Sequence, residues 1–331
     1  MSSSSILGHE RVVQRLTAAL ERGQLHHAYL FEGPAGVGKA TVAMHLAKAA
    51  NCSAGSPCDV CATCRQIEAG THPDLLRLQP DPTKASRTIP VDAVREVVRK
   101  TGYKRFDAQY RFVLIDPADA MQPAAANALL KTLEEPPAGT HFVLIVTNSA
   151  SLLPTIVSRC QRVRFGAVPE QPIIDWLTAR GAESPQLCAR LSHGCPGRAL
   201  ALSEGALERR MAVRDQLLRM VHGTVGEVFD ATADLCRGKR QDWMKDVEAL
   251  IDVAEDMIRD AAVLGSGAEL PLLNSDVSEE VGRWSQALWP TGVSRCQEAL
   301  VDIREDLALN VTGRTAVDAL VTRIRAELRP H

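Results

Sequence analysis

The segment GPAGVGKAT at residues 33–41 constrains the fold more than any other feature of this sequence. It follows an apolar stretch, AYLFEG at 28–33, and precedes a helix-forming stretch, VAMHLAKAA at 42–50. Glycines in such a strand-to-helix turn allow successive backbone N–H groups to converge, and the start of the helix adds positive potential. The segment is therefore typical of a phosphate-binding loop. The residues expected to bind phosphate are Gly33, Gly36, Gly38 and Lys39.

The residues around this loop depart from those of a working nucleotide hydrolase. Ala40 stands where a Ser or Thr hydroxyl would hold magnesium, and Thr41 lies one residue further, roughly 100° away around an ideal helix. Asp116, which ends RFVLID, can orient magnesium through water, but Pro117 replaces the group that would polarise the attacking water. We therefore expect a degenerate site for ATP or ADP, which includes Thr41 and Asp116 and hydrolyses nucleotide weakly or not at all.

Short apolar stretches alternate with helical ones up to about residue 165, as in FVLIVT at 142–147. This alternation predicts a parallel sheet with crossover helices. In the second half the periodicity is helical, because apolar residues recur at spacings of three and four: Val247, Leu250, Ile251, Ala254, Met257 and Ile258. A chain of 331 residues has room for two or three domains. We expect an α/β nucleotide-binding domain at 1–165, a small helical domain at 166–207 and an all-α domain at 208–331.

Four of the nine cysteines lie close together, in NCSAGSPCDVCATC at 51–64. Four thiolates at this spacing can close a tetrahedral zinc site that leaves no position open for a catalytic water. We expect a structural zinc module at 52–64, which stabilises the chain where little apolar surface is buried. An iron–sulfur cluster and a regulatory thiol group are the alternatives. The expected metal ligands are Cys52, Cys58, Cys61 and Cys64.

The charge balance limits the contacts that the chain can make with nucleic acid. A net charge of -2 argues against a large independent DNA-binding surface, because phosphate contacts need a clustered excess of Lys and Arg. The basic stretch VREVVRKTGYKR at 94–105 either lines a DNA channel or forms a solvated helix face.

The start, MSSSS, lacks the parts of a signal peptide, and the longest apolar run, FVLIV at 142–146, is too short to span a bilayer. We expect a soluble, cytoplasmic protein without membrane contact.

Three further stretches make the chain resemble the bacterial clamp-loader subunits of the AAA+ superfamily. They are NALLKTLEEPP at 127–137, FVLIVTNSASLLPTIVSRCQRVRF at 142–165 and LALNVTGRTAVDAL at 307–320. The resemblance covers essentially the whole chain and implies an AAA+ module, a small helical lid and a helical collar that joins subunits in a ring. The length, HPDLL at 72–76 and the altered ATPase motifs resemble the delta prime branch of this family more than the longer gamma/tau motor branch.

The resemblance also implies a role in DNA replication, as one subunit of the DNA polymerase III holoenzyme. The implied partners are the gamma/tau and delta subunits and, through the complex, the sliding clamp and primer-template DNA. Arg159 is similar to the family's arginine finger, which reaches in trans to the γ-phosphate held by a neighbouring subunit. Such a guanidinium is planar and permanently charged, and it stabilises the transferring phosphoryl group. A local salt bridge is the alternative for Arg159.

Two other stretches are similar to the family's nucleotide sensors. Thr147 and Asn148 stand where the family has a polar sensor, although a plain strand-end turn is nearly as good an interpretation. In GCPGRAL at 194–200, Gly197 takes the place of a second sensor arginine and Arg198 is displaced by one residue. Such a displacement rotates a helical side chain away from the phosphates.

These features together favour a scaffold that is largely unable to hydrolyse nucleotide. It would supply Arg159 to a neighbouring ATPase while the assembly loads a sliding clamp onto primed DNA. The alternative within the family is an active ATPase of the gamma/tau type, using Thr41 and some other acid. A small-molecule P-loop kinase is a third hypothesis, which the long helical half and the cysteine cluster disfavour.

Overall fold

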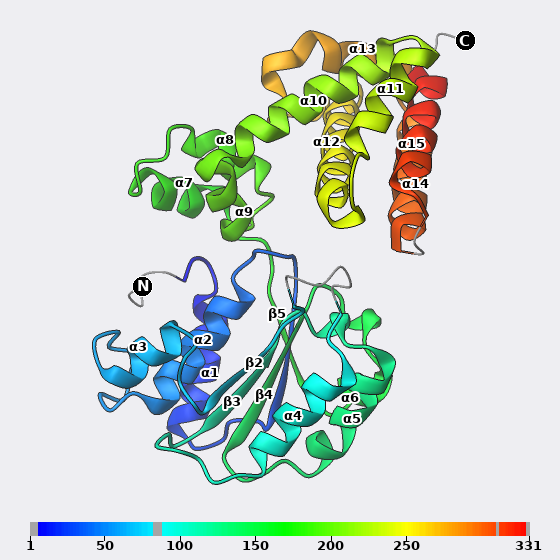
Figure 1. Cartoon of the computed structure of the whole chain (residues 1–331). Helices are drawn as coiled ribbons and strands as arrows, with labels where there is room; N and C mark the ends of the chain where they lie inside the picture. The colour runs from blue at the N-terminus through cyan, green and yellow to red at the C-terminus, as the bar shows by residue number, and fades with distance from the viewer. Residues whose placement is uncertain (1–5, 82–87, 309–310, 329–331) are drawn as a thin grey trace. The chain divides into compact units, whose positions relative to one another are not determined.

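The computed structural model describes residues 6–81, 88–308 and 311–328. The chain divides into two compact units, Met1–Leu200 and Ala201–His331 (Figure 1). The serine-rich start, and Leu309 and Asn310 of the C-terminal stretch, lie outside the described residues. Within the described ranges no helix has both the length and the apolar character that crossing a membrane requires.

The first unit is built on one parallel sheet with the strand order β2-β3-β4-β1-β5. Strands β3 and β4 are buried along their whole length, as expected for strands that helices cover on both faces. Because all strands run the same way, the carboxyl ends of β1, β3 and β4 meet at one edge. The predicted parallel sheet is thus confirmed. The strands are β1 (Ala28–Glu32), β2 (Leu75–Leu78), β3 (Arg111–Ile115), β4 (Thr140–Val146) and β5 (Gln161–Arg164).

Helices cover both faces of this sheet (Figure 1). Helix α5 shows how: it opens at Pro123 and buries Ala126, Leu129 and Leu133 in the apolar core beside the sheet. The 3₁₀ turns Ala118–Ala120 and Ser149–Ser151 follow β3 and β4. One face carries α1 (Glu10–Glu21), α2 (Lys39–Asn51) and α3 (Ala62–Glu68), and the other carries α4 (Val91–Thr101), α5 (Pro123–Glu134) and α6 (Pro154–Val157).

Three short helices follow β5 along the chain: α7 (Glu170–Thr178), α8 (Pro185–Leu191) and α9 (Pro196–Ala201). The segment that leads into them from β5 contacts the start of the chain, where a Cβ added at Gly8 would come within 2.7 Å of the Val168 side chain. Helix α9 contacts the phosphate loop, because the backbone N–H of Gly197 donates to the carbonyl of Gly36 at 2.9 Å. Helix α9 therefore borders the phosphate loop.

A buried ion pair organises the opposite edge of the sheet. Arg111 Nη2 lies 2.7 Å from Asp74 Oδ1, and both side chains are almost inaccessible. Arg111 also donates to the carbonyls of Lys100 and Tyr103, while Asp74 accepts the backbone N–H of Phe106. Such a pair is tolerated in a core only when its remaining polar atoms are hydrogen-bonded. The bonds hold the loop that follows α4 in one conformation.

The second unit contains only helices among its described residues, as predicted. Its core includes Val247, Leu250 and Ile251 of α12, so the expected helical face is buried. The buried carboxylate of Asp260 accepts the backbone N–H groups of Leu273 and Asn274 at 3.0 and 2.8 Å. The α-helices are α10 (Leu207–His222), α11 (Val225–Leu235), α12 (Arg240–Ser266), α13 (Ser278–Leu288), α14 (Thr291–Ala308) and α15 (Gly313–Leu328), with a kink at Glu204 and Gly205 before α10 and a 3₁₀ turn at Ser275–Val277.

Candidate functional site

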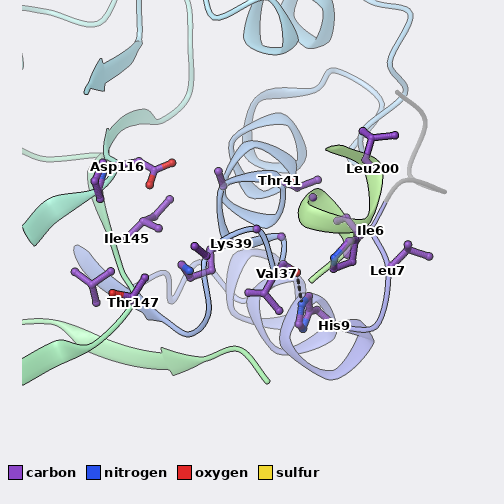
Figure 2. Close-up of a pocket in the computed structure, with 18 of the residues that line it drawn as sticks. Ile6, Leu7, His9, Val37, Lys39, Thr41, Asp116, Ile145, Thr147 and Leu200 are labelled. Atoms are coloured by element: carbon purple, nitrogen blue, oxygen red, sulfur yellow. Dashed lines mark hydrogen bonds between the residues drawn. The ribbon is translucent and has the colours of Figure 1, made fainter. Parts of the chain in front are cut away.

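A cavity of about 520 Å³ lies beside the phosphate loop, at the carboxyl ends of β3 and β4 (Figure 2). The loop itself, the small helices α7 and α9 and the segment before α1 complete its walls. The lining thus brings together most of the expected nucleotide-binding residues. The expected residues that line it are Gly36, Gly38, Lys39, Thr41 and Asp116.

The loop has the backbone conformation that its glycines predict. Gly36 and Gly38 have φ angles of 76° and 113°, which L side chains rarely adopt. A Cβ on Gly36 would also lie 3.2 Å from the backbone nitrogen of Arg198. Gly33, the first residue of the loop, leaves no room either, because its Cβ would come within 2.3 Å of the Phe165 carbonyl oxygen. The loop is therefore held by close backbone packing on both sides.

Lys39 folds back onto this loop. Its Nζ donates to the carbonyls of Gly33 and Pro34 at 2.5 and 2.6 Å, and the residue is buried. Burial lowers the pKa of the Lys39 ammonium, and the nearby Asp116 carboxylate opposes that shift. Burial likewise raises the pKa of Asp116, with Lys39 acting in the opposite direction. Lys39 would have to break its hydrogen bonds to these two carbonyl oxygens before its ammonium group could bind a phosphate.

At two positions the described residues of the cavity wall do not supply the groups that hydrolysis is expected to need. Ala40 and Pro117 both line the cavity, so a methyl group and a pyrrolidine ring stand where a metal-binding hydroxyl and a proton acceptor are needed. Figure 2 draws Thr41 on the side of α2 toward Ile6 and Leu200, away from Lys39. The described wall can hold a charged ligand through its backbone and lysine, and neither Ala40 nor Pro117 has a side chain that could activate a water.

The candidate sensor residues have different surroundings. Thr147 lines the cavity. The side chain of Asn148 instead accepts the backbone N–H of Ala150 at 2.9 Å and caps the following 3₁₀ turn, as the strand-end interpretation predicts. In α9, Gly197 lines the cavity and Arg198 does not.

The four clustered cysteines come together at the far end of α2. Their Sγ atoms all lie within 4.8 Å of one another. The backbone N–H of Cys61 donates to Cys58 Sγ at 3.4 Å, and that of Cys64 donates to Cys61 Sγ at 3.3 Å. Backbone donors lower the pKa of Cys58 to about 6, whereas burial raises that of Cys64 to about 12. In a tetrahedral zinc site with four thiolates the sulfurs lie about 3.8 Å apart, so a small contraction would bring this cluster onto a metal.

A buried lysine that the sequence analysis did not single out supports this cluster. Lys48 Nζ lies 2.7 Å from Asp59 Oδ1 and 2.6 Å from Glu68 Oε2. Asp59 follows Cys58 and has a left-handed φ of 57°, so the ion pair fixes a strained turn between two of the thiols. In the sequence, the feature that could have pointed to Lys48 is the presence of a lysine within the mostly apolar stretch VAMHLAKAA.

Arg159 lies just after α6 and is partly exposed. Its Nη2 lies 2.6 Å from Glu134 Oε1, and its Nη1 donates to the carbonyl of Thr155 at 2.8 Å. The local salt bridge that the sequence left open is therefore present. One third of the Arg159 side chain remains exposed.

The basic stretch at 94–105 is partly neutralised by its own neighbours. Arg95 lies 3.5 Å from Asp92, and Lys100 lies 2.8 Å from Glu96. Arg105 donates to the carbonyl of Ala138 at 2.5 Å. This pattern favours the solvated helix face over a dedicated DNA channel.

Comparisons with known proteins agree with one another. The family model described as "DNA polymerase III, delta subunit" matches residues 8–169. The delta' subunit of DNA polymerase III from Escherichia coli is 32% identical over 328 residues, covering 96% of this chain and 94% of the relative. The tau/gamma subunit from Haemophilus influenzae is 31% identical and matches 98% of this chain, which spans only 49% of that relative's length. A gamma-subunit-related protein from Thermotoga maritima has the same fold, with a TM-score of 0.52 and 18% identity over 96% of this chain and 99% of its own.

Proposed function

The chain belongs to the family of DNA polymerase III delta prime subunits, and from this premise we propose that it is a largely non-hydrolysing scaffold of a bacterial clamp loader. The observation that carries the proposal is that Ala40 and Pro117 line the same cavity as Lys39. The phosphate loop is present, but the side chains that hydrolysis needs are not. The protein would take part in DNA replication as a subunit of the DNA polymerase III holoenzyme.

Arg159 is the residue that we propose acts on a partner. Its partner subunits would be of the gamma/tau and delta types, and the complex would bring it to the sliding clamp and primer-template DNA. The guanidinium would stabilise charge on the γ-phosphate of a nucleotide held by a neighbouring subunit. The exposed third of its side chain supports this role. Glu134 would have to release it, and an exposed ion pair costs only about 1 kcal/mol to break.

The metal and the nucleotide complete the proposal. Zinc, bound by the four clustered thiols, would be structural, because four protein ligands leave no open position. ATP or ADP in the cavity would take Lys39 and the loop N–H groups as its ligands. The proposed division into an AAA+ domain at 1–165, a lid at 166–207 and a collar at 208–331 follows from the family.

An active ATPase of the gamma/tau type is the second candidate. One observation favours it: Lys39, Thr41 and Asp116 all line a single cavity. It would need another acid to activate water, since Pro117 has no proton acceptor.

Arg159→Ala tests the proposed role in trans. The variant should fold and join a reconstituted clamp loader, yet ATP turnover by the complex should fall. Loss of an arginine finger typically costs 10³-fold or more at the site that it serves, so the total should fall by roughly that site's share. Arg95→Ala, at an exposed arginine on α4, is the matched control and should leave turnover unchanged. Normal turnover with Arg159→Ala would refute the role.

A further inference from the structure

A second cavity in the first unit lies between α1 and the edge strand β5 and has no part in the function proposed above. Its volume is about 600 Å³. Its lining, all within the described residues, contains no Asp or Glu. The charged residues of the lining are Arg11, Arg15 and Arg22. A groove with three positive charges is notable in a chain whose net charge is -2.

The three arginines form a row along α1. Steps of four and seven residues place them within about 40° of one another around an ideal helix, separated by rises of about 6 and 10 Å. All three are exposed. In the part of the chain that the structure describes, none of them has an ion-pair partner. Guanidinium groups left without a carboxylate are suited to an anionic ligand, which they bind through paired N–H donors.

The strand beside this row has a free edge. Strand β5 ends the strand order and pairs with β1 only, among the described strands. The backbone N–H of Phe165 donates to Glu32 of β1 at 2.7 Å, so by alternation the N–H and C=O groups of Arg162 and Arg164 face outward. Unpaired strand edges accept an extended peptide as an added strand.

From these two observations we propose that the groove between α1 and β5 is a docking site for an extended acidic segment of a partner protein. The segment adds to the free edge of β5 and directs carboxylates toward Arg11, Arg15 and Arg22. Side chains on one face of a strand recur about every 7 Å, which is close to the rise of about 6 Å between Arg11 and Arg15. The backbone pairing gives affinity, and the arginine row selects acidic residues.

Single-stranded nucleic acid is a poorer fit to the groove. Such ligands bind largely by stacking bases on exposed aromatic rings. The aromatic residue of the lining is Tyr29, which is 1% exposed, and its hydroxyl accepts the backbone N–H of His26 at 3.0 Å. The groove thus offers charge and a strand edge but no stacking surface.

Fluorescence anisotropy with a labelled peptide of about ten alternating Glu and Thr residues tests the site. The full chain should bind this peptide in the micromolar range, and the peptide with Lys in place of Glu should not bind. The triple variant Arg11→Gln, Arg15→Gln, Arg22→Gln should weaken binding by about tenfold or more. The control that removes the same charge from α4 and its loop, Arg95→Gln, Arg99→Gln, Lys104→Gln, should bind as the wild type does.

A pair of substitutions on β5 separates strand addition from simple charge attraction. Arg164→Pro removes an outward N–H and should weaken binding severalfold, whereas Arg164→Ala keeps that N–H and should not. Circular dichroism checks that both variants are folded. Failure of the wild type to bind the acidic peptide, or equal binding by the triple variant, overturns the proposal. Displacement of the peptide by oligothymidylate at comparable concentration would assign the groove to nucleic acid instead, and would also overturn it.

Discussion

The phosphate loop and the thiol cluster lie at the two ends of α2. They differ in whether the side chains that the chemistry of the site needs are present. At the amino end the backbone conformation is intact, with Gly36 and Gly38 at positive φ, but Ala40 and Pro117 have replaced reactive groups. At the carboxyl end all four thiols remain within 4.8 Å. If the chain does not hydrolyse nucleotide, as proposed above, α2 serves it as a structural element whose shape is maintained at both ends.

Among the tests of this comparison, removing one thiol should have the largest effect on zinc content and stability. In Cys64→Ser the fully buried ligand is lost, and zinc content should fall from about one per chain to near zero. The free energy of unfolding should drop by about 3 kcal/mol or more, because a module of this kind would depend on the proposed zinc for its stability. Metal analysis and chemical denaturation measure both effects, and Cys236→Ser, outside the module, is the control. Full zinc content in Cys64→Ser would show that the cluster is not the metal site.

Lys48→Met should have the next largest effect. The variant leaves the carboxylates of Asp59 and Glu68 without their buried partner, next to the four thiols. Groups that support metal ligands in this way typically change metal affinity by 10-fold to 100-fold. Competition with a chromophoric chelator measures the change. Lys131→Met, at an exposed lysine on α5, should leave the affinity as it is. If both variants bind zinc equally, Lys48 has no part in the site.

The smallest effect is expected from a substitution at Glu32, at the end of β1. Glu32, the residue before Gly33, accepts the backbone N–H and the hydroxyl of Ser149 and pairs with Arg162 at 2.8 Å. These bonds lower the pKa of Glu32 from 4.5 to about 2. Glu32→Gln should cost about 1 kcal/mol of unfolding free energy at neutral pH.

The pH dependence of that cost has a defined sign. A carboxyl with a lowered pKa stabilises the fold fully above its ordinary value, and the contribution disappears as the pH falls through the folded value. The stability difference between the wild type and Glu32→Gln should therefore shrink between about pH 4.5 and pH 2. Denaturation at a series of pH values tests this, and a difference that stays constant over the range would exclude the ionised pairing.

The sequence predicted the sheet well and the long-range polar contacts poorly. RFVLID and FVLIVT matched β3 and β4 because strands buried on both faces are apolar without interruption. The cysteine cluster was predicted because its ligands are close in sequence. The pairing of Lys48 with Glu68 and of Arg159 with Glu134 depends on tertiary contacts between separate helices, which spacing along the chain does not encode.

The sequence pattern also could not predict that Lys39 donates to the Gly33 and Pro34 carbonyls. The same loop motif occurs with a lysine that faces the phosphates. Asn148 shows the converse: the strand-end turn was already one of the two interpretations, and local capping decided between them. Backbone conformation followed from residue type, whereas the direction of long charged side chains depended on the folded surroundings.

ATP turnover by the purified chain alone tests the central claim most directly. The account predicts a rate at the background of the assay, unchanged by Lys39→Ala, because the cavity lacks the groups that activate water. Turnover well above background that Lys39→Ala abolishes would contradict it and identify the chain as an active ATPase.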